Sequence, residues 1–454
     1  MAQKTLIKNI SIINEGILFV GDVLIENGLI CRIGNVLDDT TDRVVDGTGK
    51  YLFPGIIDGQ VHFREPGLTH KGDLHSESRA AVAGGVTSFI DMPNTQPNVL
   101  SMEILNEKYQ LAASKSLANY GFFLGVNGDN LDYVIQLDTA KLLGVSDDGL
   151  YFTKKGNLLA DNPDTMERLF ANCKSIIAIH SEKEQIIEEN ENTYREIYGD
   201  DVPVELHPVI RSETACYEAT KRAIDLANKH QARLHILHLT TEAETHLFRN
   251  DIPLEEKNIT TEVSVHHLWF SDADYKRLGT LIKWNPAIKT EKDKNGLLRA
   301  LLDDRIDLVT TDHAPHTLDE KQKKYFQAMS GAPIVQHSLN IMLEFYKQGR
   351  ISLEKIAEKM CHNPAKLYRI EKRGFIREGY FADLVIVDPN ASWTVSKENV
   401  LSKCGWSPLE GTVFQTQVTH TFVNGHLVFD RGHFDESQKG QALKTKENAN
   451  GGDS

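Results

Sequence analysis

The chain alternates between two patterns of hydrophobic and polar positions. Residues 1–50 carry short apolar runs separated by Gly and Asn, as in TLIKNISIINEGILFVGDVLIENGLICRIG. This pattern predicts several short β-strands joined by tight turns. From residue 51 onward the apolar runs are rich in β-formers and are separated by longer amphipathic stretches such as SETACYEATKRAIDLANKH. That alternation is typical of β-α units with parallel strands.

Eight apolar runs of this kind occur in the central region. They are GIIDGQVHF, TSFIDMPN, YGFFLGVN, LLGVSDDG, SIIAIHSE, RLHILHLT, TTEVSVHHL and IDLVTTDHAPH. Eight consecutive β-α units predict an α/β fold of the TIM (β/α)8 barrel type. In such a barrel the functional side chains lie at the C-terminal ends of the strands.

The short-strand pattern returns after about residue 372, in RGFIREGYFADLVIVDP and VTHTFVNGHLVFDRG. We therefore expect residues 1–50 and 373–435 to form one small β-sandwich domain beside a barrel of residues 51–372. The last stretch, residues 436–454, is polar, rich in Gly and Asn and without periodicity. It predicts a disordered tail.

Composition narrows the class of protein. Of the 454 residues, 40% are hydrophobic and 25% are charged, which is ordinary for a soluble globular protein. No apolar run approaches the roughly 20 residues that span a bilayer. The N-terminus, MAQKTLIKNISII, lacks the apolar core of a secretory signal. We expect a cytoplasmic protein.

Charge and cysteine usage exclude further classes. The net charge of -14, without a long basic cluster, disfavours nucleic acid and membrane partners. It leaves small molecules and other copies of the chain, as a possible homo-oligomer. The five cysteines are scattered and form no C-x-x-C pair. They predict neither a disulfide framework nor a thiolate metal site.

Polar residues cluster at the C-terminal ends of the predicted barrel strands. They are His62, Arg64, Asn94, Asp148, His180, His238, Asp312 and His316. A single histidine in a strand is more often structural than a metal ligand. Histidine and aspartate recurring at the same end of five strands, however, predict the ligands of a metal such as zinc.

Strand alternation helps to choose between neighbouring histidines. His235 and His238 are three positions apart, so on a strand they face opposite sides, and we favour His238 because it lies nearer the C-terminal end. The same argument turns Asp312 inward and His313 outward, leaving His316 on the following loop. Either His266 or His267 can line the site, and a supporting or structural role is favoured for both.

Several motifs together carry a family resemblance. DGQVHFREPG, DMPNT, HILHLTT, EVSVHHL, KWNPAIK and TTDHAPH occur in this order. Over about residues 1 to 435 the chain resembles the dihydroorotases of the amidohydrolase superfamily. Allantoinases and hydantoinases resemble it in fold but lack the arginine of VHFREP. The resemblance implies a zinc-dependent hydrolase that reversibly interconverts N-carbamoyl-L-aspartate and (S)-dihydroorotate in pyrimidine (UMP) biosynthesis.

The resemblance also implies a ligand set. It consists of His62, His180, His238, Asp312 and, on strand four, an aspartate that replaces the carboxylated lysine of other members. That aspartate is Asp148. Asp147 faces away, or exchanges roles with Asp148 if the strand ends one residue earlier. A turn or capping role for this pair is the alternative.

Position 60 departs from the family pattern, because most members have a second histidine where this chain has Gln60. A neutral amide oxygen is a poorer zinc ligand than imidazole, so Gln60 is expected to be a weak or absent ligand. We therefore expect one firmly bound Zn²⁺ with Asp148, His180 and His238, and a second that is weak or absent. Two further departures put the contacts of the substrate loop in question. They are Ala287 in place of the second proline of NPP, and SGAPIVQHS in place of PFGIVGLE.

The implied chemistry assigns roles to the remaining residues. A metal lowers the pKa of its bound water from about 15.7 to near 7, and Asp312 is placed to pass the water's proton to the leaving ring nitrogen. Arg64 pairs with the substrate carboxylate, supported by Asn94 and His316. A surface salt bridge is the alternative for Arg64. Asn285 holds the pyrimidine ring or has a turn role.

Two other functions remain open. Gln60 favours a non-catalytic scaffold that keeps the fold after losing its metal. A hydantoinase- or allantoinase-type hydrolase is the second alternative, although it leaves Arg64 without a use.

Overall fold

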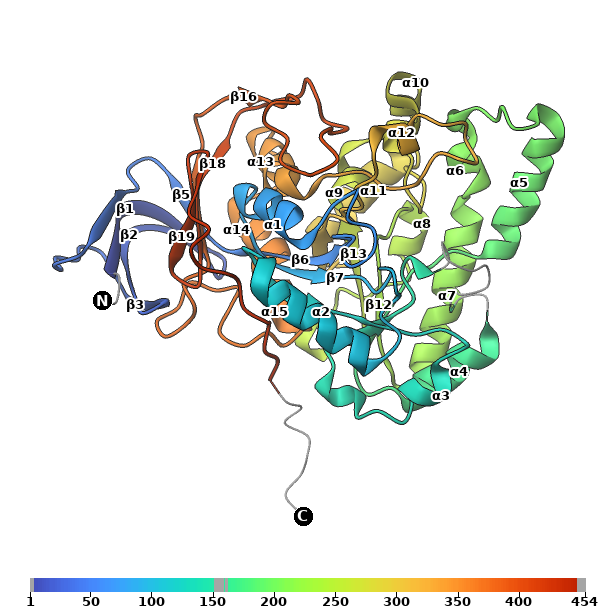
Figure 1. Cartoon of the computed structure of the whole chain (residues 1–454), viewed down its shortest axis with the longest axis horizontal. Helices are drawn as coiled ribbons and strands as arrows, with labels where there is room; N and C mark the ends of the chain where they lie inside the picture. Colours follow the sequence, from blue (N-terminus) through green and yellow to red (C-terminus); the bar gives the residue numbers. More distant parts are fainter. Residues whose placement is uncertain (1–3, 151–158, 160–161, 447–454) are drawn as a thin grey trace, which may run out of the picture.

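The computed structural model describes residues 4–150, 159 and 162–446. A barrel of parallel strands occupies the centre, helices surround it, and a sheet made from both chain ends lies at its side (Figure 1). The fold is therefore an α/β barrel with an appended sheet of chain-end strands, as predicted.

The barrel contains eight strand positions, each overlapping one of the eight predicted runs. The strands are β6 (Ile56–Val61), β7 (Val86–Asp91), β8 (Asn119–Phe122) with β9 (Leu124–Gly125), β10 (Gly144–Ser146), β11 (Ile176–Ile179), β12 (Arg233–Ile236), β13 (Ile259–Ser264) and β14 (Leu308–Thr310). All pairings among them are parallel. The ring closes where the His62 amide donates to the His313 carbonyl at 2.7 Å.

Alternate residues of the strands are buried on opposite faces. On β11, Ala178 packs in the cluster inside the barrel, whereas Ile177 packs against the surrounding helices. On β14, Leu308 and Val309 divide in the same way. Because both faces are buried, these strands are continuous apolar runs, which is why they stood out in the sequence.

The helices lie on the outside of the barrel. The predicted helix around residues 212–230 is α7 (Glu213–His230); the Ser212 side chain accepts a hydrogen bond from the Ala215 amide at 3.3 Å and caps its first turn. Its buried residues recur every three or four positions. The others are α1 (Leu74–Ala83), α2 (Met102–Lys115), α3 (Leu131–Val134), α4 (Pro163–Asn172), α5 (Glu184–Tyr198), α6 (His207–Ile210), α8 (Glu242–Thr245), α9 (Val265–Trp269), α10 (Tyr275–Leu278), α11 (Glu291–Leu302), α12 (Leu318–Lys321), α13 (Ser338–Lys347), α14 (Leu353–Ala357) and α15 (Asn363–Leu367).

The two chain ends share one nine-stranded sheet. Its strands are β1 (Lys4–Asn14), β2 (Ile17–Glu26), β3 (Leu29–Gly34), β4 (Arg43–Asp46), β5 (Tyr51–Pro54), β15 (Leu384–Asp388), β18 (Gln417–Val423), β19 (His426–Asp430) and β20 (His433–Phe434). The ends join where β5 pairs with β15. Since β5 belongs to this sheet, the barrel begins after residue 54 and not at 51. The other predicted domain boundaries stay predictions. A separate two-stranded ribbon, β16 (Trp393–Thr394) with β17 (Val413–Phe414), lies in the segment between β15 and β18.

The segment 436–446 is ordered, which corrects the expectation of a tail beginning at residue 436. The Gly440 amide donates to the Ser116 carbonyl at 2.8 Å, the Tyr120 amide donates to the Gln441 carbonyl at 3.0 Å, and the Leu443 side chain is buried. The order of this segment could not be predicted from its polar composition, because hydrogen bonds between backbone groups leave no pattern in the sequence. Residues 447–454 lie outside the described residues.

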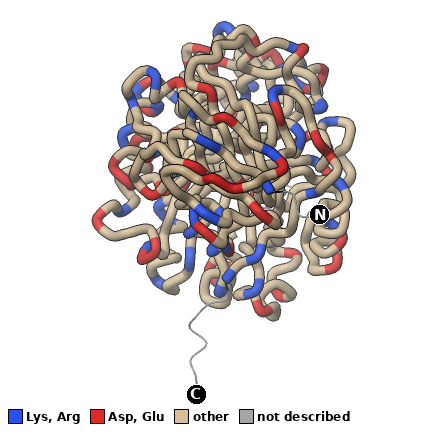
Figure 2. Tube along the Cα trace, turned by 90° about the vertical axis from the view of Figure 1, so that its left-hand side faces the viewer, with Lys and Arg blue, Asp and Glu red and all other residues tan. Residues whose placement is uncertain are grey.

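Charged residues of both signs are interspersed on the side that carries the chain-end sheet (Figure 2). Within the part of the chain that the structure describes, no helix combines the length and apolarity needed to cross a bilayer.

Asp383 links the chain-end sheet to the barrel. Its side chain is buried and forms an ion pair with Arg373. It also accepts hydrogen bonds from the Asn119 side chain of β8 at 3.1 Å and from the Asn424 amide, in the turn after β18, at 2.7 Å. One carboxylate therefore joins three segments that are far apart in the chain.

We predict that Asp383→Ala lowers the free energy of unfolding by about 3–5 kcal/mol, because it leaves the Arg373 guanidinium buried without its counter-charge. Urea unfolding followed by circular dichroism measures the change. Asp132→Ala removes an exposed ion pair with Arg168 and serves as the control, with the midpoint expected to stay close to that of the wild type. An Asp383→Ala midpoint equal to that of the control contradicts the linking role.

Candidate active site

The predicted ligand residues meet at the mouth of the barrel. His62 follows β6, Asp148 follows β10, His180 follows β11, His238 follows β12 and Asp312 follows β14. All five side chains are buried. They come from parallel strands, whose C-terminal ends lie on the same side of the barrel.

These side chains form two groups that could each hold a metal ion. Asp148, His180 and His238 form the first, and His62, Asp148 and Asp312 the second; within each group the ligand atoms lie within 4.8 Å of one another. Imidazole nitrogens and carboxylate oxygens are the donors that zinc accepts. The residues therefore fit the implied metal, with Asp148 common to both groups.

The two carboxylate oxygens of Asp148 face different groups. Its Oδ2 lies 3.3 Å from His62 Nε2, and its Oδ1 lies 3.6 Å from His180 Nδ1 and 3.9 Å from His238 Nε2. Asp147 instead accepts hydrogen bonds from the Leu159 amide at 2.7 Å and the His180 amide at 3.0 Å. Of the two alternatives left open by the sequence, the structure places Asp148 between the histidines.

Gln60 lies beside this cluster but presents a donor to it. The fully buried Gln60 side chain donates from Nε2 to Asp148 Oδ2 at 2.9 Å. Its Oε1, the amide atom able to bind a cation, has no hydrogen-bond partner among the described residues. The amide therefore interacts with Asp148 as a hydrogen-bond donor. A metal ligand at this position would instead bind the same cation as Asp148.

Buried charges in the cluster stabilise one another. Burial opposes a charge on His62, but hydrogen bonds to Asp148 and Asp312 raise its pKa to about 10. Burial also opposes the charge of Asp148, but its histidine neighbours hold its pKa well below the usual range. For Asp312, burial prevails and the pKa is raised. A raised pKa brings Asp312 closer to the range in which a general base is effective at neutral pH.

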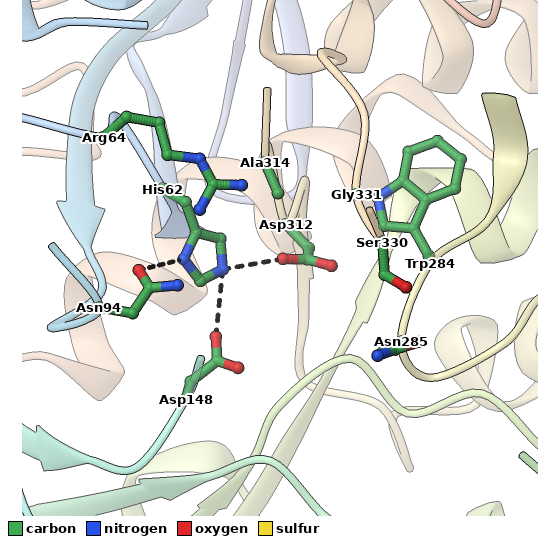
Figure 3. A pocket seen from close by; sticks show the side chains of 10 residues that line it. All are labelled: His62, Arg64, Asn94, Asp148, Trp284, Asn285, Asp312, Ala314, Ser330 and Gly331. Atoms are coloured by element: carbon green, nitrogen blue, oxygen red, sulfur yellow. Dashed lines mark hydrogen bonds and ion pairs between the residues drawn. The ribbon is translucent and has the colours of Figure 1, made fainter. Parts of the chain in front are cut away.

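Asn94 orients His62 as well as lining the pocket. Its Oδ1 accepts a hydrogen bond from His62 Nδ1 at 2.8 Å, which leaves Nε2 facing Asp148 and Asp312 (Figure 3). The position of Asn94 requires Gly149, because a Cβ there would lie 2.1 Å from Asn94 Nδ2. The sequence predicted only a substrate contact for Asn94.

Glu182 holds His180 from the other side and was missed in the sequence analysis. His180 Nε2 lies 2.7 Å from Glu182 Oε2, and the fully buried Glu182 also pairs with Arg211. This contact turns His180 Nδ1 toward Asp148. An acid two positions after the histidine, in IHSE, was the available signal.

A pocket with about 290 Å³ of empty space, its open mouth included, adjoins the cluster. It is lined by His62, Arg64, Asn94, Asp148, Trp284, Asn285, Asp312, Ala314, Ser330 and Gly331 (Figure 3). Six of these ten residues were predicted. The other four lie in loops, where side-chain periodicity gives no information.

Arg64 is a buried cation in this pocket. Its side chain donates from Nε to the Pro315 carbonyl at 3.1 Å, and its Nη2 lies 3.0 Å from His316 Nε2. Among the described residues no carboxylate oxygen lies within ion-pair distance of it. Since Arg64 is 5% exposed, the alternative of a surface salt bridge is wrong.

Three site residues have a left-handed backbone. The φ angle is 67° at Arg64, 37° at His238 and 48° at Asp312. Such conformations cost non-glycine residues about 1–3 kcal/mol each and persist where the surrounding structure imposes them. They turn these side chains into the barrel mouth just after their strands end.

Two buried lysines hold the loop that forms one wall of the pocket. Lys321 Nζ donates to the carbonyls of Lys283, Met329 and Gly331 at 2.7–3.0 Å. Lys283 Nζ donates to the carbonyls of Tyr325 and Ala328, both at 2.7 Å. This wall is therefore tied to the segment that carries Trp284 and Asn285.

The other histidines at the ends of the barrel strands occupy different environments. His238 is in the cluster, but the alternation argument for it does not apply, because β12 ends at Ile236. His235 also lies inside the barrel, 3.0 Å from Glu262. His313 turns outward to Glu77 at 2.8 Å, as predicted.

The supporting role favoured for His266 and His267 agrees with their contacts. His266 stacks on Trp284 with ring centroids 4.1 Å apart, and His267 Nε2 lies 3.2 Å from the Pro286 carbonyl. Neither is in a ligand group.

Comparison with known proteins identifies the class. A family model described as the amidohydrolase family matches residues 51–428. The protein belongs to the amidohydrolase family.

Within this class the chain is similar to dihydroorotases. It is 33% identical to the dihydroorotase of Methanosarcina acetivorans over 417 residues, covering 89% of this chain and 88% of the relative. It is 32% identical to that of Trichlorobacter lovleyi over 428 residues, covering 92% and 96%.

Solved structures agree on the fold. The L-hydantoinase of Arthrobacter aurescens superposes with a TM-score of 0.90 at 25% identity, over 98% of this chain and 100% of that one. The dihydropyrimidinase of Brevibacillus agri superposes with a TM-score of 0.86 at 23% identity, over the same shares.

We predict that Glu182→Gln weakens zinc binding by about ten- to a hundredfold, because carboxylates that orient a ligating histidine typically contribute that much. Titration against a chelator of known affinity measures it. Glu196→Gln, on the exposed face of α5, is the matched control and should leave the affinity unchanged. Equal affinities for the two variants would show that Glu182 does not position His180.

Proposed function

We propose that this protein is a zinc-dependent cyclic amide hydrolase that interconverts N-carbamoyl-L-aspartate and (S)-dihydroorotate in pyrimidine biosynthesis. The observation that carries the proposal is the buried Arg64 guanidinium, without a carboxylate partner among the described residues, in a pocket shared with the candidate metal ligands. A substrate with a cyclic amide and a carboxylate fits both features. The similarity to dihydroorotases supports the same substrate.

The metal proposal follows from the donor atoms. Asp148, His180 and His238 would hold one Zn²⁺ firmly, and His62 with Asp148 and Asp312 would hold a second one weakly or not at all. Gln60 supports this asymmetry, since its amide donates a hydrogen bond to Asp148. When bound, zinc supplies a Lewis acid for the amide carbonyl and lowers the pKa of water.

The side chains of the pocket transfer the proton and bind the substrate. Asp312 accepts the proton of the attacking water and returns it to the ring nitrogen as the amide bond breaks. In ring closure the same carboxylate takes the proton from that nitrogen. Arg64 pairs with the substrate carboxylate through its planar donors, and Asn285 binds the ring from the opposite wall.

Two alternatives use fewer of these features. A hydantoinase-type activity is compatible with the fold of the L-hydantoinase, but an uncharged hydantoin gives the buried Arg64 no negative charge to pair with. A metal-free scaffold is compatible with Gln60, but it gives no reason for five buried imidazoles and carboxylates to converge at one point.

The substrate is a small molecule. We infer that the enzyme is cytoplasmic, because pyrimidine precursors are made in the cytoplasm. Self-association is also inferred. The Leu18 and Val20 side chains, two positions apart on β2 and so on one face, are 44% and 60% exposed, and exposed apolar side chains on one face of a sheet favour burial against another chain.

Turnover of purified protein supplied with zinc tests the function. We expect ring opening of dihydroorotate and little action on hydantoin. Chromatography of the products measures both reactions. Asp312→Asn should lower turnover by about 10²–10⁴-fold, because it removes the proton acceptor. Action on hydantoin alone would contradict the substrate, and no turnover of either compound would favour the scaffold.

We predict that Gln60→His raises the number of tightly bound zinc ions from one to two, because imidazole is a better zinc ligand than an amide oxygen. Elemental analysis after mild chelation measures the count. Gln60→Asn keeps the amide and should remain at one. Two zinc ions that resist chelation in the wild-type protein would contradict the assigned role of Gln60.

A further inference from the structure

The imidazole of His316 lies between two cationic side chains. Arg64 Nη2 is 3.0 Å from its Nε2, and Lys71 Nζ is 3.1 Å from its Nδ1. All three side chains are buried, with exposed fractions of 5%, 6% and 2% for Arg64, Lys71 and His316. Neither cation has a lone pair to offer, so both act only as hydrogen-bond donors.

A neutral imidazole cannot satisfy both neighbours. Burial and the Arg64 guanidinium hold the pKa of His316 well below its usual range, so the ring is neutral. A neutral ring has one N–H and one lone pair. His316 therefore accepts from only one cation, and its N–H faces the other donor. Glu320 Oε2 also lies near Nδ1, but at 3.6 Å it is beyond hydrogen-bond distance, whereas Lys71 Nζ is at 3.1 Å.

The two cations differ in how their charge is balanced. Lys71 pairs with Glu320, with Nζ 2.9 Å from Oε1. Arg64 has no carboxylate within ion-pair distance in the described part of the chain, and it lines the pocket. Arg64 is therefore the cation that an incoming anion attracts, while Lys71 stays with Glu320.

Backbone contacts fix the frame around this group. The His316 carbonyl accepts a hydrogen bond from Trp406 Nε1 at 2.8 Å. The Leu68 amide donates to the Arg64 carbonyl at 3.0 Å, and the Lys71 amide donates to the Leu68 carbonyl at 3.0 Å. The segments carrying Arg64, Lys71 and His316 are thus held, and the adjustable parts are the guanidinium and the position of the imidazole proton.

We infer that Lys71 is a positioning residue that makes His316 a hydrogen-bond donor to the substrate carboxylate. When the carboxylate enters, Arg64 Nη2 donates to it and no longer to His316 Nε2. The lone pair of the imidazole then lies on Nδ1, where it accepts from Lys71, and the proton lies on Nε2, where it points to the carboxylate. The proton changes place on the ring through exchange with water, and none is gained or lost.

This arrangement gives the pocket a preference for substrates that carry a carboxylate. Arg64 and His316 Nε2–H would bind the anion together, and Lys71 would act through His316 without touching it. A neutral ring compound does not supply an anionic acceptor for Arg64. Arg64 then keeps its contact with His316 Nε2, and His316 cannot donate from that nitrogen. The inference rests on the proposed function and names a residue that sets its selectivity.

Two measurements on Lys71→Met test the inference. Loss of a hydrogen bond to a charged group corresponds to about a tenfold or larger effect, so KM for dihydroorotate should rise about tenfold while kcat changes less than about twofold. Lys71→Arg, which keeps a donor, should recover most of the loss. Lys403→Met, at an exposed lysine paired with Asp73, is the control and should resemble the wild type.

The tautomer itself is measured by nitrogen NMR of ¹⁵N-histidine-labelled protein with bound orotate, a carboxylate-bearing ring that is not opened. His316→Gln identifies the resonances. We expect the proton on Nε2 in the wild type and in Lys71→Arg, and on Nδ1 or distributed over both nitrogens in Lys71→Met. This measurement needs binding only, so a folded variant without turnover is still informative.

The outcomes separate the two proposals. Wild-type protein that neither binds orotate nor opens dihydroorotate would overturn the proposed function. If the wild-type protein does both, the role of Lys71 is tested by Lys71→Met. An unchanged KM or an unchanged Nε2–H tautomer in this variant would overturn that role. If Lys71→Met does not fold, Lys71→Leu, which also removes the donor, replaces it with the same expected results.

Discussion

The structure depends on one constraint: four ionisable side chains from separate strands are buried together around Asp148. A buried carboxylate is costly unless each oxygen has a partner. Asp148 has His62 and Gln60 on one oxygen and His180 with His238 near the other. The barrel makes this possible because it brings the ends of distant strands to one place while the strands themselves remain apolar.

Further polar residues orient the groups around this cluster. Glu182 turns His180, and Asn94 turns His62, so that each imidazole presents one defined nitrogen. In the substrate pocket, Lys71 contacts Nδ1 of His316, as Glu182 contacts His180 in the cluster. In each case a polar side chain outside the immediate site determines which nitrogen of a histidine is available. The chemistry thus depends on contacts that the candidate ligands alone do not reveal.

Gln60 changes the balance of the cluster without disrupting it. Its amide is fully buried, and it donates to the carboxylate that both ligand groups share. One half of the cluster therefore keeps two imidazoles and a carboxylate, and the other has one imidazole with two carboxylates. This difference is why we propose unequal metal affinities for the two halves.

The sequence by itself determined the barrel, the pairing of the chain ends and the residues at the strand ends. Buried parallel strands leave continuous apolar runs, and His62 or Asp312 interrupts them at a fixed place. Only the tertiary structure decided between Asp147 and Asp148, ordered the segment 436–446, and brought Lys71 beside His316. These outcomes depend on where a strand ends and on contacts between distant loops, for which local periodicity carries no information.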